Sequence, residues 1–365
     1  MMCEVLTEKI GRLTGTRDEG RRPALFRALA PRWLTPLLAL VCFAPAAWSQ
    51  GLNLDFGTSY GVPASAYGAA AGQAGSWNQV GLGVSGLLDL SGVASSASVN
   101  LVASTASGNT GAVPVDDDEL LLADNFFTTS GGTWSVTLSG LSVGDYRVYL
   151  YAASNSGVPS GAMNVGGTAV ASIPGDPGSA LVEGTSWVKT RVCLSGGTLA
   201  ISGSANLSGL AGLQLAPAPP FENYCTAGVS ASGCAATLMG SGVPSATAVS
   251  GFTLSAANVE GGKNGIYFFG SNGRQANSWG SGTSFQCVVP PVGRAGLLSG
   301  SGTTGLCDGS FAQDFNALWC PSCPKPAKNP GAGAVVQVQL WYRDPFNTSN
   351  QTTSLSDAIE FCVGP

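Results

Sequence analysis

Hydrophobic and polar residues alternate along much of the chain, a pattern typical of half-buried β-strands. The first clear case is LNLDFG, in which Leu52, Leu54 and Phe56 fall on one face. SASVNLVAS has the same period, and SGLAGLQLA ends the first group of such runs. No stretch among them has a convincing helical period, so the pattern predicts an all-β protein.

Two segments are expected to form β-hairpins, because each contains two strand-like runs around a short turn. GTWSVTLSGLSVGDYRVYLYAAS has its turn at 143–145, and WVKTRVCLSGGTLAISGS has its turn at Gly196 and Gly197. Several short strands with frequent turn signals predict a β-sandwich over residues 51–216.

A proline-rich segment separates two halves of the chain. GLQLA is followed by PAPP, and proline cannot continue the hydrogen-bonded ladder of a sheet. A length of 365 residues also suggests two domains. We therefore expect a linker at 217–221, a second β-sandwich at 222–365, and an architecture of two jelly-roll-like sandwiches in tandem.

The composition restricts the chemistry. Charged residues make up only 10% of the chain, against roughly 25% in an average soluble protein. The chain contains no histidine, which excludes Ser-His-Asp and Cys-His catalysis and histidine-ligated metals. Beyond residue 49 there are 9 basic and 17 acidic side chains, a formal charge of −8. Such a surface repels phosphates, so no nucleic-acid partner is expected.

Residues 1–49 predict an export signal. Four arginines between positions 21 and 32 precede a short apolar stretch at 33–43, and Ala47-Trp48-Ser49 fits a cleavage site. The apolar stretch is too short to span a bilayer comfortably. We expect a secreted or cell-surface protein that is cleaved after Ser49, with no membrane insertion of the mature chain.

Export makes the remaining cysteines candidates for disulfides. Cys193 stands alone, whereas seven others lie between residues 225 and 362. A Cys287–Cys307 bond is expected to close the Gly/Ser-rich loop between these two cysteines and to stabilise the folded protein by roughly 3 kcal/mol. Cys225 is expected to pair with Cys234, and the alternative is a bond from Cys225 to residue 362 at the other end of the sandwich.

The WCPSCP segment favours a local Cys320–Cys323 disulfide. A thioredoxin-like redox site would need the first cysteine at a helix N-terminus, and the surrounding prolines oppose a helix. A zinc site would need two further ligands, and none of them can be histidine.

The acidic run DDDELLLADN contains candidate calcium ligands, since calcium takes six to eight oxygens. Asp116, Asp118 and Asp124 are the residues proposed for this role. The spacing is not that of an EF-hand, and successive side chains of an extended segment point in opposite directions. A solvated acidic loop is the preferred alternative. Paired carboxylates also carry out glycoside hydrolysis, but nothing marks one of these as a proton donor.

Aromatic residues in the Gly/Ala-rich opening of the first half could form a carbohydrate platform. Tyr60, Tyr67 and Trp77 offer flat rings, and Asn78 could contact sugar hydroxyls. The alternative is that Trp77 packs on the sandwich core, because aromatic residues more often pack within a protein than bind a ligand.

The segment WYRDPFNTSNQTTSLSDAIEF near the end of the chain predicts a strand, a polar loop and a returning strand. Arg343 keeps its proton near neutral pH, so it is a poor general acid or base. We expect it to form a fork of hydrogen bonds to Asp344, Asp357 or Glu360, or to loop carbonyls, that ties this hairpin shut. The carboxylates on either side of Ala358 are expected to face water.

Both halves resemble known families. VTLSGLSVGDYRVYLYA followed by GLAGLQL is similar to galactose-binding-like jelly-roll domains, which often bind carbohydrate. The second half resembles an uncharacterised domain at the C-termini of many secreted bacterial proteins. The shared features are Y-C, G-C, C-V-x-P-P, D-F-N-A, W-x-R-D-P and L-S-D-A in that order. This second resemblance implies an all-β fold and export, and it implies no activity.

Taken together, these features predict a secreted, non-enzymatic binding or structural protein. The first alternative is a lectin-like carbohydrate-binding protein, with or without calcium, and the second is a carboxylate-based hydrolase. Glycans or other surface proteins are the expected partners, and calcium is the one cofactor considered.

Overall fold

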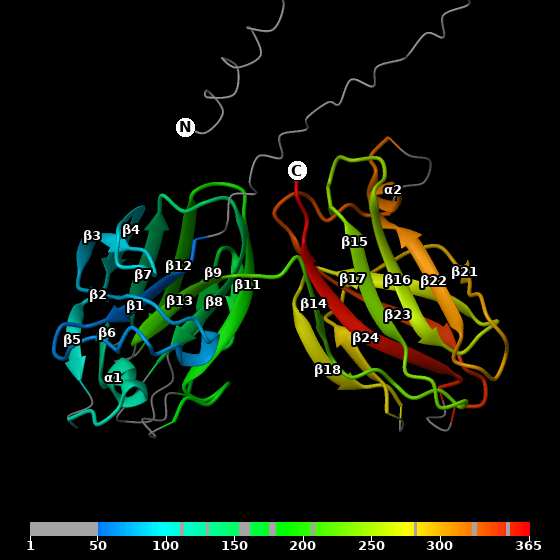
Figure 1. Ribbon diagram of the computed structural model, residues 1–365, viewed down its shortest axis with the longest axis horizontal. Coiled ribbons are helices and arrows are strands. Elements are labelled where there is room, and N and C mark those ends of the chain that lie inside the picture. Colours follow the sequence, from blue (N-terminus) through cyan, green and yellow to red (C-terminus); the bar gives the residue numbers. More distant parts are fainter. Residues whose placement is uncertain are drawn as a thin grey trace, which may run out of the picture. The chain divides into compact units, whose positions relative to one another are not determined.

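The computed structural model describes residues 50–109, 113–128, 131–152, 161–174, 180–205, 209–280, 283–322, 327–347 and 351–365. The predicted export signal at 1–49 lies outside these ranges. The described residues belong to one compact unit, Pro45–Pro365. They form an all-β protein built from mainly antiparallel sheets packed as sandwiches, with β1 and β2 as a parallel pair (Figure 1). No helix in the described ranges is long and apolar enough to cross a membrane.

The first sandwich consists of two sheets, with strand orders β11-β8-β13-β1-β2 and β10-β9-β12-β7-β4-β3, together with the two-stranded pair β5-β6. Its elements are β1 (Leu52–Phe56), η1 (Ala69–Ala71), β2 (Trp77–Val80), β3 (Gly83–Leu88), β4 (Ala94–Val102), β5 (Thr105–Asn109), α1 (Asp117–Ala123), β6 (Asp124–Phe127), β7 (Gly132–Ser139), β8 (Gly144–Tyr151), β9 (Met163–Val165), β10 (Thr168–Val170), β11 (Trp187–Leu194), β12 (Thr198–Ala205) and β13 (Gly212–Pro217). The alternating apolar residues of both sheets meet in one core, which includes Leu54, Val136 and Val148.

The two predicted hairpins of the first half are wrong. Strand β7 pairs with β4 and β12, whereas β8 pairs with β11 and β13 in the other sheet. Likewise, β11 and β12 lie in different sheets. Each short connection therefore crosses the edge of the sandwich, so that both strands bury their apolar faces in the same core from opposite sides. The two crossovers touch through a hydrogen bond from the Leu141 N–H to the Gly197 carbonyl, 3.0 Å long.

Strand β1 is buried on both faces, which its alternation did not predict. Leu52, Leu54 and Phe56 face the core. The opposite face carries Asn53 and Asp55, and the nearby loop with η1 and the helix α1 supply a second apolar cluster on this side of the sheet. The helix begins at an acidic run in which sequence reasoning expected a loop.

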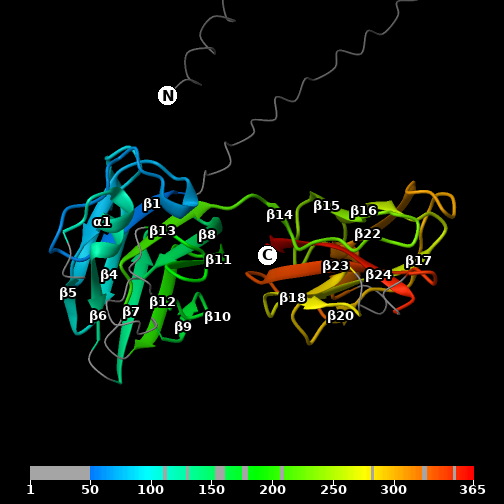
Figure 2. The ribbon, with the colours of Figure 1, turned by 90° about the horizontal axis from the view of Figure 1, so that it is seen from below.

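The second sandwich has sheets of strand order β14-β24-β23-β17-β20 and β15-β16-β22, together with the two-stranded pair β18-β19. Its elements are β14 (Phe221–Tyr224), β15 (Thr237–Gly242), β16 (Phe252–Val259), β17 (Asn264–Gly270), β18 (Arg274–Ser278), β19 (Phe285–Val288), β20 (Gly293–Arg294), β21 (Leu298–Ser299), β22 (Gly309–Asp314), α2 (Phe315–Trp319), β23 (Val335–Arg343) and β24 (Thr353–Cys362). Figure 2 shows β15, β16 and β22 as one layer of this sandwich and β17, β23 and β24 as the next.

An aromatic cluster fills the core of the second sandwich. Phe252 lies 4.8 Å from Phe361 and 6.2 Å from Phe315, measured between ring centroids, and most of these contacts are tilted or edge-to-face. Trp319 at the end of α2 packs 5.2 Å from Phe315. These large rings account for much of the buried apolar area that stabilises the fold.

The predicted C-terminal hairpin is confirmed, since β23 and β24 pair in antiparallel fashion with a register shift near Gln339. The residues alternating with the core positions, however, are buried too. Glu360 is only 4% exposed, and its carboxylate accepts hydrogen bonds from Arg274 and from Gln337. The expectation that this carboxylate faces water is therefore wrong, because the β18-β19 pair packs over the outer face of the sheet.

Disulfides link distant parts of the described chain. The pairs are Cys193–Cys362, Cys225–Cys287 and Cys234–Cys307. The first joins the end of β11 in the first sandwich to the end of β24 in the second, with the two Cα atoms 5.7 Å apart. The expected Cys320–Cys323 bond cannot be compared with the structure, because Cys323 lies outside the described residues.

The expected pairs Cys287–Cys307 and Cys225–Cys234 are wrong, and so is the alternative Cys225–Cys362. Cysteine connectivity cannot be deduced from spacing, because packing decides which strands lie together. Here β19 covers the sheet beside β14, which places Cys287 against Cys225 rather than against Cys307.

Candidate functional site

The predicted carbohydrate platform is packed into the first sandwich. Trp77 and Asn78 are 6% and 7% exposed, so neither presents a free surface. The Trp77 indole stacks on the Tyr67 ring at 5.9 Å and donates a hydrogen bond to the Tyr67 carbonyl. The Tyr67 hydroxyl donates to Asp118, and Tyr60 donates its backbone N–H to Asp124. These residues therefore stabilise the fold in the way that the packing alternative describes.

The predicted calcium residues do not converge on one point. Asp116 caps α1 by accepting a hydrogen bond from the Glu119 N–H at 2.8 Å, and Asp118 accepts from Tyr67. Asp124 lies at the other end of this seven-residue helix. At 1.5 Å per residue, the helix separates Asp124 from Asp116 by about 10 Å along its axis. The acidic run is a helix start, and its D-x-x-E spacing is the signal that could have predicted it.

The carboxylates around the C-terminal hairpin bind partners other than Arg343. Asp344 accepts the backbone N–H of Ala231 at 3.1 Å, and Asp357 accepts that of Leu238 at 2.8 Å. The predicted clasp from Arg343 to one of these groups is therefore wrong. Asp344 is occupied by a loop of the second sandwich and Asp357 by strand β15, which the sequence pattern could not place beside the hairpin.

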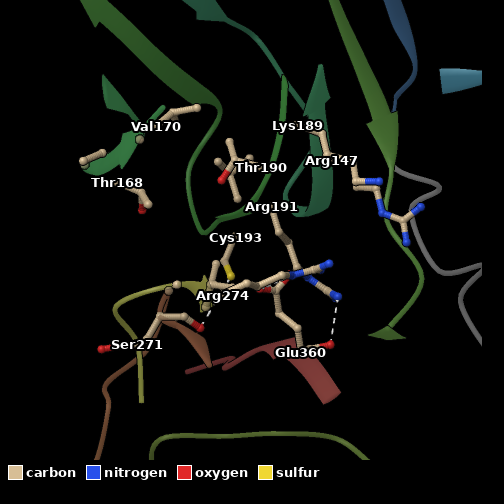
Figure 3. A pocket seen from close by; sticks show the side chains of 18 of the residues that line it. Arg147, Thr168, Val170, Lys189, Thr190, Arg191, Cys193, Ser271, Arg274 and Glu360 are labelled. Carbon is tan, nitrogen blue, oxygen red and sulfur yellow. Dashed lines mark hydrogen bonds and ion pairs between the residues drawn. The ribbon is translucent and has the colours of Figure 1, made fainter. Parts of the chain in front are cut away.

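A cavity of about 850 Å³ is lined by residues of both sandwiches. Figure 3 shows Arg191 and Arg274 beside Glu360 in this cavity. Arg191 is 4% exposed and donates hydrogen bonds to the Glu360 carbonyl, to Asp145 at 2.8 Å and to the linker carbonyl of Pro219 at 2.7 Å. It holds the linker against both sandwiches.

The other charged side chains that line this cavity form ion pairs with one another. Arg147 contacts Glu222 at 2.7 Å, and Arg274 contacts both Glu222 and Glu360. The arginines hold the pKa of Glu222 below its usual range despite partial burial. Asp145 also lies near the sulfurs of Cys193 and its partner, but those sulfurs are joined to each other and are not free thiolate ligands. The residues of this cavity therefore connect the two sandwiches and the linker.

A second cavity, of about 370 Å³, lies on the outer face of the second sandwich, and we call it the Trp341 groove. Pockets of this size commonly hold small ligands. Its lining residues are Ile266, Phe268, Trp279, Gln286, Val292, Arg294, Trp341, Arg343, Gln351, Thr352, Thr353 and Leu355.

Strand register builds the apolar floor of the groove. Ile266 on β17 is opposite Trp341 on β23, which in turn is opposite Leu355 on β24. The β18-β19 pair covers only part of this face, and Trp279 closes one side by donating its indole N–H to the Thr353 hydroxyl at 3.1 Å. The Trp341 ring therefore stays partly exposed beside a polar rim.

Two arginines stand at the groove without a carboxylate partner among the described residues. Arg343 ends β23 with its guanidinium 5.5 Å from the centre of the Trp341 ring, and Arg294 ends β20 beside Phe268. Both are exposed. Sequence reasoning assigned Arg343 to a clasp and missed Arg294 and Trp279. One signal was present: in LWYR, Trp341 and Arg343 alternate with core positions and so share the outer face.

Comparison with known proteins gives no family for this chain. No family model matches it, and no curated protein matches it. Two solved structures from Bacteroides uniformis show a faint likeness. One is β-glucuronidase 2 covalently bound to cyclophellitol-6-carboxylate aziridine, with 15% identity over 62% of this chain and 26% of that chain, at a TM-score of 0.16. The other is a β-glucuronidase with 11% identity over 72% of this chain and 31% of that chain, also at 0.16. This chain spans less than a third of either, and a likeness so low carries no argument about function.

Proposed function

We propose that this is an exported, non-catalytic binding protein, and that the Trp341 groove takes a saccharide bearing a carboxylate or sulfate group. The observation that carries the proposal is the combination of a partly exposed indole, an apolar floor and two unpaired arginines in one groove.

The chemistry of the lining residues matches such a ligand. A sugar ring has an apolar face that packs on an aromatic surface, and Trp341 offers that surface. The guanidinium fork of Arg294 or Arg343 fits the two oxygens of an anionic substituent. Gln286, Gln351 and the threonines of the rim can exchange hydrogen bonds with hydroxyl groups.

Binding is favoured over catalysis at this place because no lining residue carries a carboxylate, an imidazole or a thiol. Glycoside hydrolysis in particular relies on a pair of carboxylates near the scissile bond. The three disulfides suit an oxidising compartment outside the cytosol.

The test is a glycan array with neutral and acidic members, followed by calorimetry on the strongest ligand. Trp341→Ala should weaken binding at least about tenfold, as expected for a central aromatic contact. Arg343→Gln should weaken binding of the acidic glycan and leave its neutral analogue unchanged. Trp187→Ala is the matched control, because this tryptophan lies on the first sandwich and should not affect binding.

Three results would count against the proposal. An array without hits from folded protein would exclude a saccharide ligand. Equal binding by the Trp341→Ala variant would place the ligand elsewhere. Release of new reducing ends from the bound glycan would show that the protein is a hydrolase.

A further inference from the structure

Asp55 is a buried carboxylate without a hydrogen-bond donor. It lies in β1 between two core residues and is 1% exposed. Neither of its carboxylate oxygens has a hydrogen-bond partner among the described residues. Buried polar groups in native proteins nearly always have partners, so this carboxylate needs either a proton or a cation.

Asp124 begins β6, which contacts β1, and its carboxylate is held in place by backbone N–H groups. Its carboxylate accepts from Ser59 at 2.7 Å and from Tyr60 at 3.2 Å, although the residue is only 1% exposed. Burial raises the pKa of Asp124, and these donors only partly offset that rise by favouring the ionised form. Two buried acidic side chains thus lie on two strands in contact, one with backbone donors and one with none.

Gly57 shows how closely the backbone after β1 approaches Asp124. A Cβ atom at position 57 would lie 2.3 Å from the Asp124 carboxyl carbon, and the glycine has a φ of +136°. The chain therefore passes directly over this carboxylate only two residues after Asp55. Burial raises the pKa of Asp55, and the negative charge of Asp124 raises it further.

We infer that Asp55 and Asp124 together bind one divalent cation of the calcium type. A doubly charged ion neutralises the two carboxylates and supplies the missing partner of Asp55. The available ligands are all oxygens, which hard cations such as Ca²⁺ prefer over softer metals. Carbonyl groups and water would complete the coordination. The acidic turn at the start of α1 is a separate feature, because its side chains are already engaged within the protein.

The test uses the full purified chain after treatment with EDTA, titrated with CaCl₂ in a calorimeter and by thermal unfolding. One calcium per chain should bind and raise the melting temperature. Asp55→Asn and Asp124→Asn should each weaken binding at least tenfold. Asp118→Asn is the matched control, with the same loss of charge at the acidic turn, and its affinity should stay within twofold of the wild type.

Several outcomes would overturn the inference. They are no heat and no thermal shift at millimolar calcium, unchanged affinity in Asp55→Asn, or loss of binding in Asp118→Asn. A second measurement guards against a variant that fails to fold. Without cation, the wild-type protein should lose stability as pH rises above about 4, because Asp55 must ionise while buried. Calcium should reduce this loss, and an identical pH profile with and without calcium would refute the site. It lies on the first sandwich, so failure of the Trp341 groove would leave this inference intact.

Discussion

Removal of the Cys193–Cys362 disulfide tests how strongly the two sandwiches depend on each other. The bond joins positions that are 169 residues apart and lie on different sandwiches. A double Cys193→Ser, Cys362→Ser variant removes it without adding bulk. Arg191 still contacts Asp145, the Pro219 carbonyl and β24, so the native contacts survive and the main effect falls on the unfolded chain.

The expected loss follows from the loop that this bond closes. The other two disulfides lie within the 169-residue span and shorten the covalent path between its ends to roughly a hundred residues. A loop of that size restricts the unfolded chain by about 4.7 kcal/mol on the chain-entropy model. For a protein of this size, this corresponds to a fall in melting temperature on the order of 10 °C.

The assay is urea and thermal unfolding of the variant and the wild type under non-reducing conditions. Peptide mapping must first show that Cys225–Cys287 and Cys234–Cys307 are intact in both proteins, so that the loss can be assigned to one bond. A change below about 1 kcal/mol would refute the reasoning, because it would mean that the sandwiches unfold independently.

The remaining predictions concern two side chains of the C-terminal hairpin. Arg343→Ala should change the free energy of unfolding by no more than about 0.5 kcal/mol, since the residue is exposed and has no carboxylate partner in the described chain. Urea unfolding measures this change. A loss above about 2 kcal/mol would show that Arg343 does stabilise the hairpin. Burial raises the pKa of Asp357 to about 6, against the hydrogen bonds from Asn223 and Leu238. The folded state therefore holds this proton more tightly than the unfolded state, and the stability of the wild type relative to Asp357→Asn should fall between pH 4 and pH 6. Parallel pH profiles of the two proteins would contradict this.

Strand positions were predictable from alternation where a strand buries one face. In β23, the apolar face of Val336, Val338 and Leu340 was identified correctly. Pairing partners were not predictable in the same way. The run around 143–145 has the composition of a hairpin turn, yet β7 and β8 lie in opposite sheets. Turn residues show that the chain reverses, and the shape of the shared core decides whether it stays in the same sheet.

The candidate sites depended on which side chains are covered by distant segments. Trp77 looked like an exposed ring because its neighbours are glycine and alanine, but the cluster beside α1 buries it. Trp341 lies between core residues in a strand, yet it faces the outer side of the sheet, where it packs on the cluster of Phe268, Val288 and Leu355 and stays partly exposed. Coverage of this kind arises from contacts between residues far apart in sequence, which local pattern cannot supply.

The use of positive charge in this chain is the strongest general argument for the Trp341 groove. Only nine lysines and arginines follow residue 49. Five of them form ion pairs with carboxylates, namely Arg147, Lys189, Arg191, Lys263 and Arg274. Within the described ranges, Arg294, Arg343 and Lys328 form none, although acidic residues outnumber basic ones, and the two arginines lie at the same groove. Two unpaired arginines beside one aromatic floor, in a protein so poor in cations, are the arrangement expected if an anionic ligand supplies the missing charge.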